Sequence, residues 1–346
     1  MRITPVALAL ALVASWSLPR AVRADAYHPH PTPDALQPTL DASLPSYEPS
    51  GQYTGQLKAV TSQTIEFVLR RWIEAFKQVQ PGIKITFEPS GGEPAANSLN
   101  SGKADIGIIT REMSPQGLQA FVRTYGYSPL PVPICGGSFR QKSYSDAMTF
   151  IVNKDNPLDK ITYAELDVIF SADHKRGHPP LANWGDLGVT GPLADKPIHP
   201  WTIKAWDGFE EFIRQQVLAG GEFRPAIYQT DDGTRPLSAE VANDPCAISL
   251  DSLAWVGPGV KHLKIAVDPK GPYHELTAEE VFNWKWPLAR KLYAYINREP
   301  GTEVKPALKE FLRFIISKEG QQCVIDDKIY VPLNAEMSRK SEALIR

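Results

Sequence analysis

Apolar positions follow a clear pattern between residues 57 and 113, and their spacing changes from one segment to the next. After a polar turn at residues 61–64, apolar side chains recur every three or four positions, at Ile65, Val68, Leu69, Trp72, Ile73 and Phe76. This spacing predicts an amphipathic helix that buries one face, and Pro81-Gly82 predicts its end. A strand, a hydroxyl-rich turn and a helix are therefore expected in this order.

Two further strands are expected after this helix. Ile83, Ile85 and Phe87 alternate with polar residues, whereas residues 104–109 form a mostly apolar run that is typical of a buried parallel strand. A glycine-rich turn at residues 90–94 separates the two strands. Turns that follow parallel strands bring backbone N–H groups and hydroxyls to one edge of the sheet, where an anion is readily held. This edge is the first candidate ligand site.

Strands and helices continue to alternate along the rest of the chain. Ser114-Pro115 opens a helix that ends before Gly126, with an inner face expected at Leu118, Phe121, Val122 and Tyr125. Capping boxes are expected at residues 162–165, 207–210 and 277–280, a further amphipathic helix at 308–316, and strands at 148–152, 263–267 and 293–297. The alternation predicts an α/β fold with mainly parallel sheets.

The N-terminus is typical of an exported protein. Arg2 precedes an apolar run at residues 6–18, and Ala24-Asp25-Ala26 provides small residues around a possible cleavage site. This run is shorter than the roughly 20 residues that span a bilayer, so residues 1–26 are expected to be a cleaved signal peptide. Residues 27–54 are rich in proline and are expected to form an extended leader that drapes over the first lobe or leaves it.

Composition narrows the classes of partner. Hydrophobic residues make up 42% and charged residues 22% of the 346 residues, as in an ordinary soluble protein with room for two lobes. The formal net charge is -2, and removing residues 1–26 would take away three arginines and one aspartate to leave -4. A basic footprint is missing, which argues against a nucleic-acid partner.

Cysteine and histidine residues give no metal motif along the sequence. Cys135, Cys246 and Cys323 lack metal-ligand spacing, and they allow at most one intramolecular disulfide, whose pairing the sequence does not fix. His174 and His178 are four residues apart, but Gly177 and the prolines that follow predict a loop rather than a helix face. Neither a metal nor a cofactor is expected.

Several motifs in a fixed order resemble those of the periplasmic phosphate-binding (PstS-like) solute receptors of ABC transporters. They include Ala104-Asp105-Ile106-Gly107 before Thr110-Arg111, and further motifs at residues 125–127, 154–157, 169–171, 184–188, 287–288 and 318–321. The resemblance spans roughly residues 44 to 333. It implies the type II periplasmic binding protein fold, in which two lobes are joined by crossover hinge strands. The implied boundaries are residues 55–147 and 263–346 for the first lobe and 148–262 for the second.

The resemblance also implies a ligand cleft between the lobes. Its contacts would come from Ser62 and Thr64 in the first turn, from Gly91 and Gly92 in the second, and from Asp105, Thr110 and Arg111 around the third strand. Asp207 and Gly208 would line the opposite wall, where the family usually has an arginine and hydroxyl residues. Lys204 is an alternative to that missing arginine.

Two carboxylates weaken the expectation that phosphate is the ligand. Glu93 and Asp207 stand where donors are expected, and a carboxylate about 4 Å from a phosphate charge repels it by about 1 kcal/mol in water and about 4 kcal/mol at an effective dielectric constant of 20. Alternative roles are open: Asp207 as a helix N-cap, Glu93 as a solvated turn residue, Thr61 and Ser62 as caps, and Arg111 as an ion-pair partner. Trp201 and Trp206 could stack on an organic ligand or serve lobe packing.

The expected function is therefore capture of phosphate or a related oxyanion by a monomeric periplasmic receptor that delivers it to an ABC transporter permease, without stable membrane insertion. The alternative is a divergent protein of the same fold that binds another solute or acts as an extracytoplasmic sensing or interaction protein. An enzyme is not expected, because Ser62 has neither a Gly-x-Ser-x-Gly setting nor an accompanying His/Asp arrangement.

Overall fold

A computed structural model describes residues 30–203, 209–225, 227–230 and 237–346. Residues 32–346 form one compact unit, which contains two five-stranded sheets and a two-stranded sheet. In the described part of the chain, no helix is long and apolar enough to cross a membrane. Lys204, Trp206, Asp207 and Gly208 lie outside the described residues.

The first sheet has the strand order β2-β1-β3-β12-β4. Its strands are β1 (Gly55–Ser62), β2 (Ile83–Ser90), β3 (Ile106–Ile109), β4 (Leu130–Gly136) and β12 (Lys291–Ile296). β1 runs parallel to β2 and β3, whereas β12 lies antiparallel between β3 and β4. A strand from the C-terminal part of the chain therefore completes a sheet that the N-terminal part begins.

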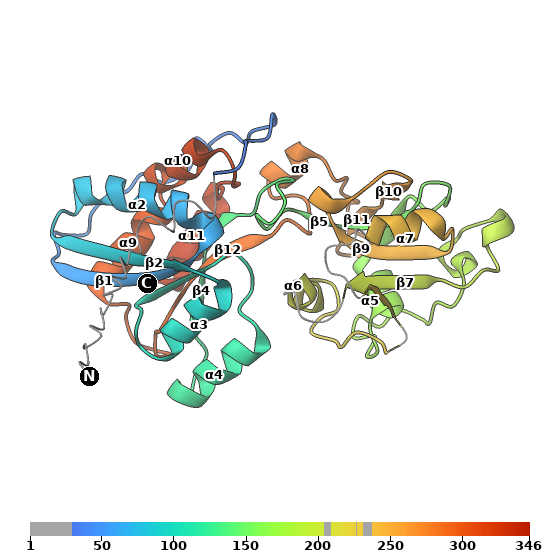
Figure 1. The fold of residues 1–346 in the computed structure, drawn as a ribbon, viewed down its shortest axis with the longest axis horizontal. Helices are drawn as coiled ribbons and strands as arrows, with labels where there is room; N and C mark the ends of the chain where they lie inside the picture. The colour runs from blue at the N-terminus through green and yellow to red at the C-terminus, as the bar shows by residue number, and fades with distance from the viewer. Residues whose placement is uncertain (1–29, 204–208, 226, 231–236) are drawn as a thin grey trace, which may run out of the picture. The chain divides into compact units, whose positions relative to one another are not determined.

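Helices cover both faces of this sheet (Figure 1), because its strand residues alternate between two hydrophobic clusters. Leu57 and Ala59 of β1 face one side, together with α2 (Glu66–Val79), α9 (Pro306–Ile316) and α10 (Lys318–Asp327). Val60 faces the other side. That side is covered by α3 (Gly92–Asn100) and α4 (Pro115–Tyr125), whereas α11 (Ala335–Leu344) packs beside β4 and α9.

The second sheet has the order β10-β5-β9-β7-β8 and also mixes parallel and antiparallel pairs. Its strands are β5 (Met148–Asn153), β7 (His199–Ile203), β8 (Tyr228–Thr230), β9 (Ala247–Ser252) and β10 (Val260–His262). The remaining helices are α5 (Tyr163–Phe170), α6 (Phe209–Gln216), α7 (Leu237–Asn243) and α8 (Ala278–Phe282). β6 (Lys160–Thr162) pairs with β11 (Lys264–Ala266), and short 3₁₀ turns lie at Gln63–Ile65, Trp184–Leu187, Gly191–Leu193 and Leu253–Trp255.

Part of the proline-rich segment packs against the first sheet's helices. Leu44 is buried, and the Tyr47 hydroxyl donates to Glu310 Oε2 at 2.6 Å. Asp41 Oδ2 accepts a hydrogen bond from the backbone N–H of Ala335 at 2.8 Å. These contacts fix the described residues of this segment on α9 and the start of α11.

The α/β prediction is confirmed, and the sheets that were expected to be mainly parallel are mixed, since β12 in the first sheet and β5 in the second are antiparallel to their neighbours. The helix behind residues 61–64 and the Ser114-Pro115 helix start are confirmed, and Ser114 accepts a hydrogen bond from Gly117 N. Val122 is exposed, so its assignment to the buried face of α4 was wrong. The capping box at residues 162–165 is confirmed, whereas Thr277 caps α8 alone because the Glu280 carboxylate pairs with His274.

Candidate functional site

The carboxyl ends of three strands meet at one edge of the first sheet. The register pairs Ser62 with Ser90 across β1 and β2, and Thr61 with Ile108 across β1 and β3. Thr110 follows directly after β3. Ser62, Ser90 and Thr110 are therefore neighbours in strand order at this edge, as the sequence predicts.

Two helices begin in the segments that follow β2 and β3. The Gly91 N-cap precedes α3, and the Ser114 N-cap precedes α4. A Cβ atom added to Gly92 would lie 3.3 Å from Ile109 Cγ2 and 3.6 Å from Arg111 Nε. The guanidinium of Arg111 therefore lies close to the first turn of α3, where the helix dipole also favours an anion.

Arg111 is paired with Glu93, the carboxylate that was expected to repel a bound phosphate. Arg111 Nη2 lies 3.5 Å from Glu93 Oε1, and the Ser114 hydroxyl donates to Glu93 Oε2 at 3.2 Å. The two side chains are 30% and 46% exposed, so the pair is accessible to solvent and its ions are screened. The Glu93 carboxylate therefore lies at this edge as a hydrogen-bond acceptor, and it does not point away from the edge as a solvated turn residue would.

The hydroxyl residues of the first turn do not serve as helix caps. Ser62 precedes the 3₁₀ turn without a side-chain capping hydrogen bond, although it is buried. Thr64 Oγ1 is buried next to the buried hydroxyl of Tyr330 and takes no part in capping the helix. The alternative in which Ser62 acts as a cap is therefore wrong for this conformation.

The backbone of Thr110 is hydrogen-bonded to the segment that precedes β5. Its backbone oxygen accepts a hydrogen bond from the Ser145 hydroxyl. Ser145 itself packs against Gly137, where an added Cβ atom would lie 1.7 Å from Ser145 O. This close approach requires glycine at residue 137 and fixes the position of the Thr110 backbone.

Asp105 lies at the amino end of β3, at the opposite end of the strand from Thr110. Its assignment to the ligand site was therefore wrong. Asp105 precedes β3, whose four residues at about 3.3 Å each separate it from Thr110. Its Oδ2 accepts a hydrogen bond from Lys58 N at 2.9 Å, and its Oδ1 lies 3.8 Å from Lys305 Nζ. The carboxylate of Asp105 thus joins the amino end of β3 to the middle of β1, and the structure does not bring it together with Arg111.

Trp201 packs within the second sheet. Its ring stacks on Tyr228 at a centroid distance of 5.0 Å and an interplanar angle of 23°. This contact agrees with the packing role that the sequence analysis left open for Trp201.

A buried group of charged residues next to the edge was missed by sequence reasoning. Arg290 is 4% exposed, precedes β12, and places Nη2 4.0 Å from Oε2 of the buried Glu112. Asp146 Oδ2 accepts hydrogen bonds from the Ser252 hydroxyl and from Ala254 N, the latter at 2.8 Å. Asp251 adjoins Ser252 at the carboxyl end of β9. These groups connect the segment after β3 with the end of β9.

Burial changes the protonation of this group. Desolvation raises the pKa of Asp251 to about 7, and it also raises the pKa of Glu112 and of Asp146. Desolvation lowers the pKa of Arg290, whereas the Glu112 and Asp146 carboxylates oppose this change. The acids next to the edge therefore hold their protons more tightly than free carboxyl groups.

Comparisons with known proteins agree with this architecture. A family model described as PBP superfamily domain matches residues 46–319. The phosphate-binding protein PstS of Pseudomonas aeruginosa is 31% identical over 303 residues, which cover 87% of this chain and 90% of that protein. Protein SphX of Synechococcus elongatus is 23% identical over 278 residues, or 80% of this chain and 77% of that one. The crystal structure of PstS from Borrelia burgdorferi is 18% identical with a TM-score of 0.50, covers 80% of this chain and 98% of that one, and supports the fold alone. The chain therefore belongs to the PBP superfamily and, within it, to the PstS family.

Proposed function

We propose that this protein is an extracytoplasmic receptor that captures phosphate or a related tetrahedral oxyanion and delivers it to an ABC transporter permease. The observation that carries the proposal is the position of Arg111 over Gly92, at the edge where β1, β2 and β3 end. The name of the Pseudomonas aeruginosa relative, phosphate-binding protein PstS, supports the choice of anion.

The proposed contacts are a subset of those expected from the sequence. Ser62 and Thr64 supply hydroxyls, Gly91 and Gly92 supply backbone N–H groups, and Thr110 and Arg111 complete the wall. A phosphate carries about -1.5 to -2 charges at neutral pH, and each charge-assisted hydrogen bond contributes roughly 1.5 to 3 kcal/mol. Asp105 is omitted because its carboxylate serves the other end of β3.

The role of Glu93 follows from its pairing with Arg111. The Glu93 carboxylate is paired with the same guanidinium that a bound anion needs. Binding then exchanges one acceptor for another, and the anion must release Arg111 from Glu93. This exchange lowers the affinity below that of a site without a competing carboxylate.

The organisation of the chain fits the same proposal. Residues 1–26 are a signal peptide that is removed on export, and residues 27–54 form the leader. The expected boundary at residue 263 lies too early, because Leu263, Ile265 and Trp286 pack in the core of the second sheet and β11 pairs with β6. Residues 55–147 and the segment from β12 onward therefore build one lobe, and residues 148–288 build the other. The mature receptor is a monomer in the periplasm. Family membership places it among binding proteins rather than enzymes.

Isothermal titration calorimetry of the mature protein with phosphate tests the proposal. We expect a dissociation constant near micromolar, weakened at least about tenfold by Arg111→Ala, which corresponds to about 1.4 kcal/mol. Arg123→Ala on the exposed part of α4 is the matched control and should leave the affinity unchanged. Equal affinities for the parent and Arg111→Ala would contradict the proposed contact.

A receptor for another solute is the second candidate, and the Arg111–Glu93 pair is the observation that favours it. A paired guanidinium offers less positive charge to an anion than an unpaired one does. If millimolar phosphate gives neither heat nor a shift in melting temperature, phosphate is rejected. A melting shift with an uncharged or zwitterionic solute under the same conditions would then support this second function.

A further inference from the structure

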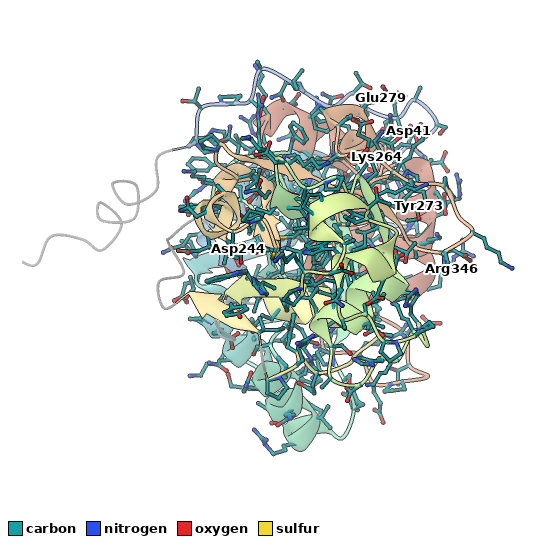
Figure 2. All side chains as sticks on the ribbon, turned by 90° about the vertical axis from the view of Figure 1, so that its right-hand side faces the viewer. Asp41, Asp244, Lys264, Tyr273, Glu279 and Arg346 are labelled. Atoms are coloured by element: carbon teal, nitrogen blue, oxygen red, sulfur yellow. The ribbon has the colours of Figure 1, made fainter. Side chains whose placement is uncertain are left out.

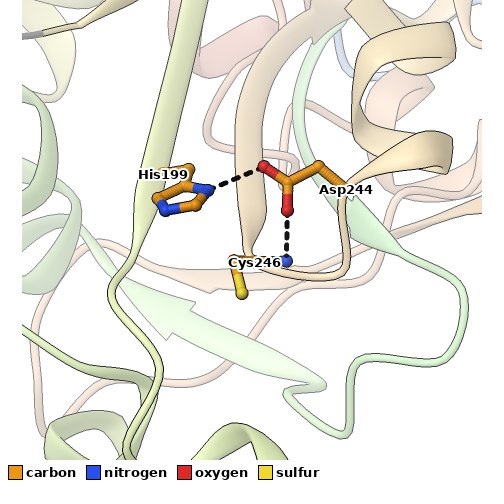
Figure 3. Close-up of side chains that lie close together, drawn as sticks. All are labelled: His199, Asp244 and Cys246. Atoms are coloured by element: carbon orange, nitrogen blue, oxygen red, sulfur yellow. Dashed lines mark hydrogen bonds and ion pairs between the residues drawn. The ribbon is translucent and has the colours of Figure 1, made fainter.

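A cluster of three different metal-ligating side chains lies at the amino end of the second sheet, away from the strand ends that form the proposed anion site. His199 is the first residue of β7, and Asp244 and Cys246 lie in the turn between α7 and β9 (Figure 3). Figure 2 shows Asp244 beside this sheet. One ligand atom from each residue lies within 4.8 Å of the other two.

The backbone brings these side chains together through strand register. β7 and β9 are parallel, with His199 paired to Ala247, and His199 N donates to Cys246 O at 2.8 Å. Asp244 Oδ1 accepts a hydrogen bond from Cys246 N at 2.9 Å, which fixes the carboxylate above the turn. The other carboxylate oxygen, Oδ2, lies 2.7 Å from His199 Nδ1.

We propose that His199, Asp244 and Cys246 form a zinc-binding site with three protein ligands and an open fourth position. Imidazole nitrogen, carboxylate oxygen and thiolate sulfur are the donors that Zn²⁺ takes, and three protein ligands plus a water is its usual open arrangement. The open position faces solvent, because the His199 and Asp244 side chains are each 29% exposed and Cys246 is also partly exposed.

The observed spacing requires only small side-chain movements. Zinc–ligand bonds of about 2.0 to 2.3 Å in a tetrahedron place neighbouring donor atoms roughly 3.3 to 3.8 Å apart. The His199–Asp244 contact of 2.7 Å must therefore open by about 0.6 Å, and the other separations, which are all within 4.8 Å, must close by at most about 1 Å. The metal takes the place of the proton between Nδ1 and Oδ2, and the Cys246 thiol releases its proton to solvent.

The alternative is an ordinary hydrogen bond between His199 and Asp244 with a bystander thiol next to it. In that case no bond between the metal and the Cys246 sulfur is expected. Cobalt distinguishes the two cases, because Co²⁺ occupies zinc sites and a Co²⁺–thiolate bond produces a charge-transfer band in the near ultraviolet. Cys135 and Cys323 are both buried, and neither belongs to a three-ligand group of this kind among the described residues.

The experiment uses the mature protein freed of metal with a chelator. We expect one equivalent of Co²⁺ to produce the charge-transfer band, Zn²⁺ to displace it, and Zn²⁺ alone to raise the melting temperature. Cys246→Ser abolishes the band, and His199→Gln and Asp244→Asn each weaken zinc binding at least about tenfold, the lower end of the effect of losing metal-site interactions. His178→Gln, in the loop at residues 171–183, is the matched control and leaves zinc binding unchanged.

Absence of the band in the folded parent protein would overturn the proposal, as would equal zinc affinity in the parent and Cys246→Ser. Circular dichroism of each variant establishes that it is folded. If Cys246→Ser does not fold, His199→Gln provides the same comparison, since its side chain is partly exposed and its main-chain bonds are kept. Phosphate titration of Cys246→Ser is expected to match the parent, so the anion site and the zinc site are tested separately.

Discussion

Replacing Glu93 by glutamine removes a negative charge that is paired with Arg111 while keeping the size of the side chain. Glu93 Oε1 lies 3.5 Å from Arg111 Nη2, so the carboxylate competes with any anion for the same guanidinium. If the receptor binds phosphate at this edge, Glu93→Gln should tighten binding.

The magnitude follows from distance and exposure. An anion bound to the far side of the guanidinium would have its charge about 6 Å from the carboxylate, where two unit charges repel by about 0.7 kcal/mol in water and about 2.8 kcal/mol at an effective dielectric constant of 20. Glu93 is 46% exposed, so the value for water is the closer one. For a ligand charge of about -1.5 to -2 the repulsion is roughly 1 to 1.4 kcal/mol, which predicts five- to tenfold tighter binding, as an approximate range.

Isothermal titration calorimetry at two ionic strengths is the assay. The gain in phosphate affinity should become smaller with added salt, because the Debye length falls from about 10 Å at 0.1 M to about 3 Å at 1 M. Glu88→Gln makes the same charge change at an exposed position of β2 and should have little effect. Weaker phosphate binding by Glu93→Gln would refute the reasoning, because it would mean that the carboxylate accepts a hydrogen bond from a protonated ligand.

Two further predictions concern stability. Burial raises the pKa of Asp251 from 3.8 to about 7. The folded state therefore holds this proton more tightly than the unfolded chain, and stability falls as the pH rises between these values, by at most roughly 4 kcal/mol. Asp251→Asn should reduce the loss of melting temperature between pH 5 and pH 8, and an unchanged loss in scanning fluorimetry would contradict this assignment. Gly137→Ala should lower the free energy of unfolding by about 1 to 3 kcal/mol and weaken anion binding, because its Cβ atom would displace Ser145 from Thr110. Gly55→Ala, whose Cβ would meet only Ala307 at 3.5 Å, is the control in urea denaturation.

The sequence predicted the elements whose signal is local and periodic. The face of α2 from Ile65 to Phe76 could be identified because burial repeats every three or four residues along it. Helix α3 was not predicted, since Gly92, Pro94 and Asn97 are weak helix formers and Pro94 is tolerated only in the first turn. Contacts with β3 and α4 stabilise this helix instead.

The sequence predicted the site in part, for a similar reason. Ser62 and Thr110 could be placed at one edge because parallel strands end together, whereas Asp105 was assigned from its motif without regard to the strand between it and Thr110. The buried ion pair of Arg290 with Glu112 joins residues 178 positions apart, and no local pattern indicates that a charge will be buried. Such groups become visible only once the topology is known.

The position of β12 between β3 and β4 has a consequence for how the protein is made. Its hydrogen bonds connect β3 to β4, so the first sheet remains split until residues 291–296 have been synthesised. The Trp72 indole N–H donates to the carbonyl oxygen of Gly320 at 2.7 Å, so this hydrogen bond also forms only after the C-terminal segment has been synthesised. Because pairing between such distant segments is slow, an incomplete chain exposes the edges of β3 and β4 for most of its synthesis. Until β12 is made, the unpaired backbone groups of β3 and β4 can pair with other chains, so the partly synthesised protein is prone to aggregation.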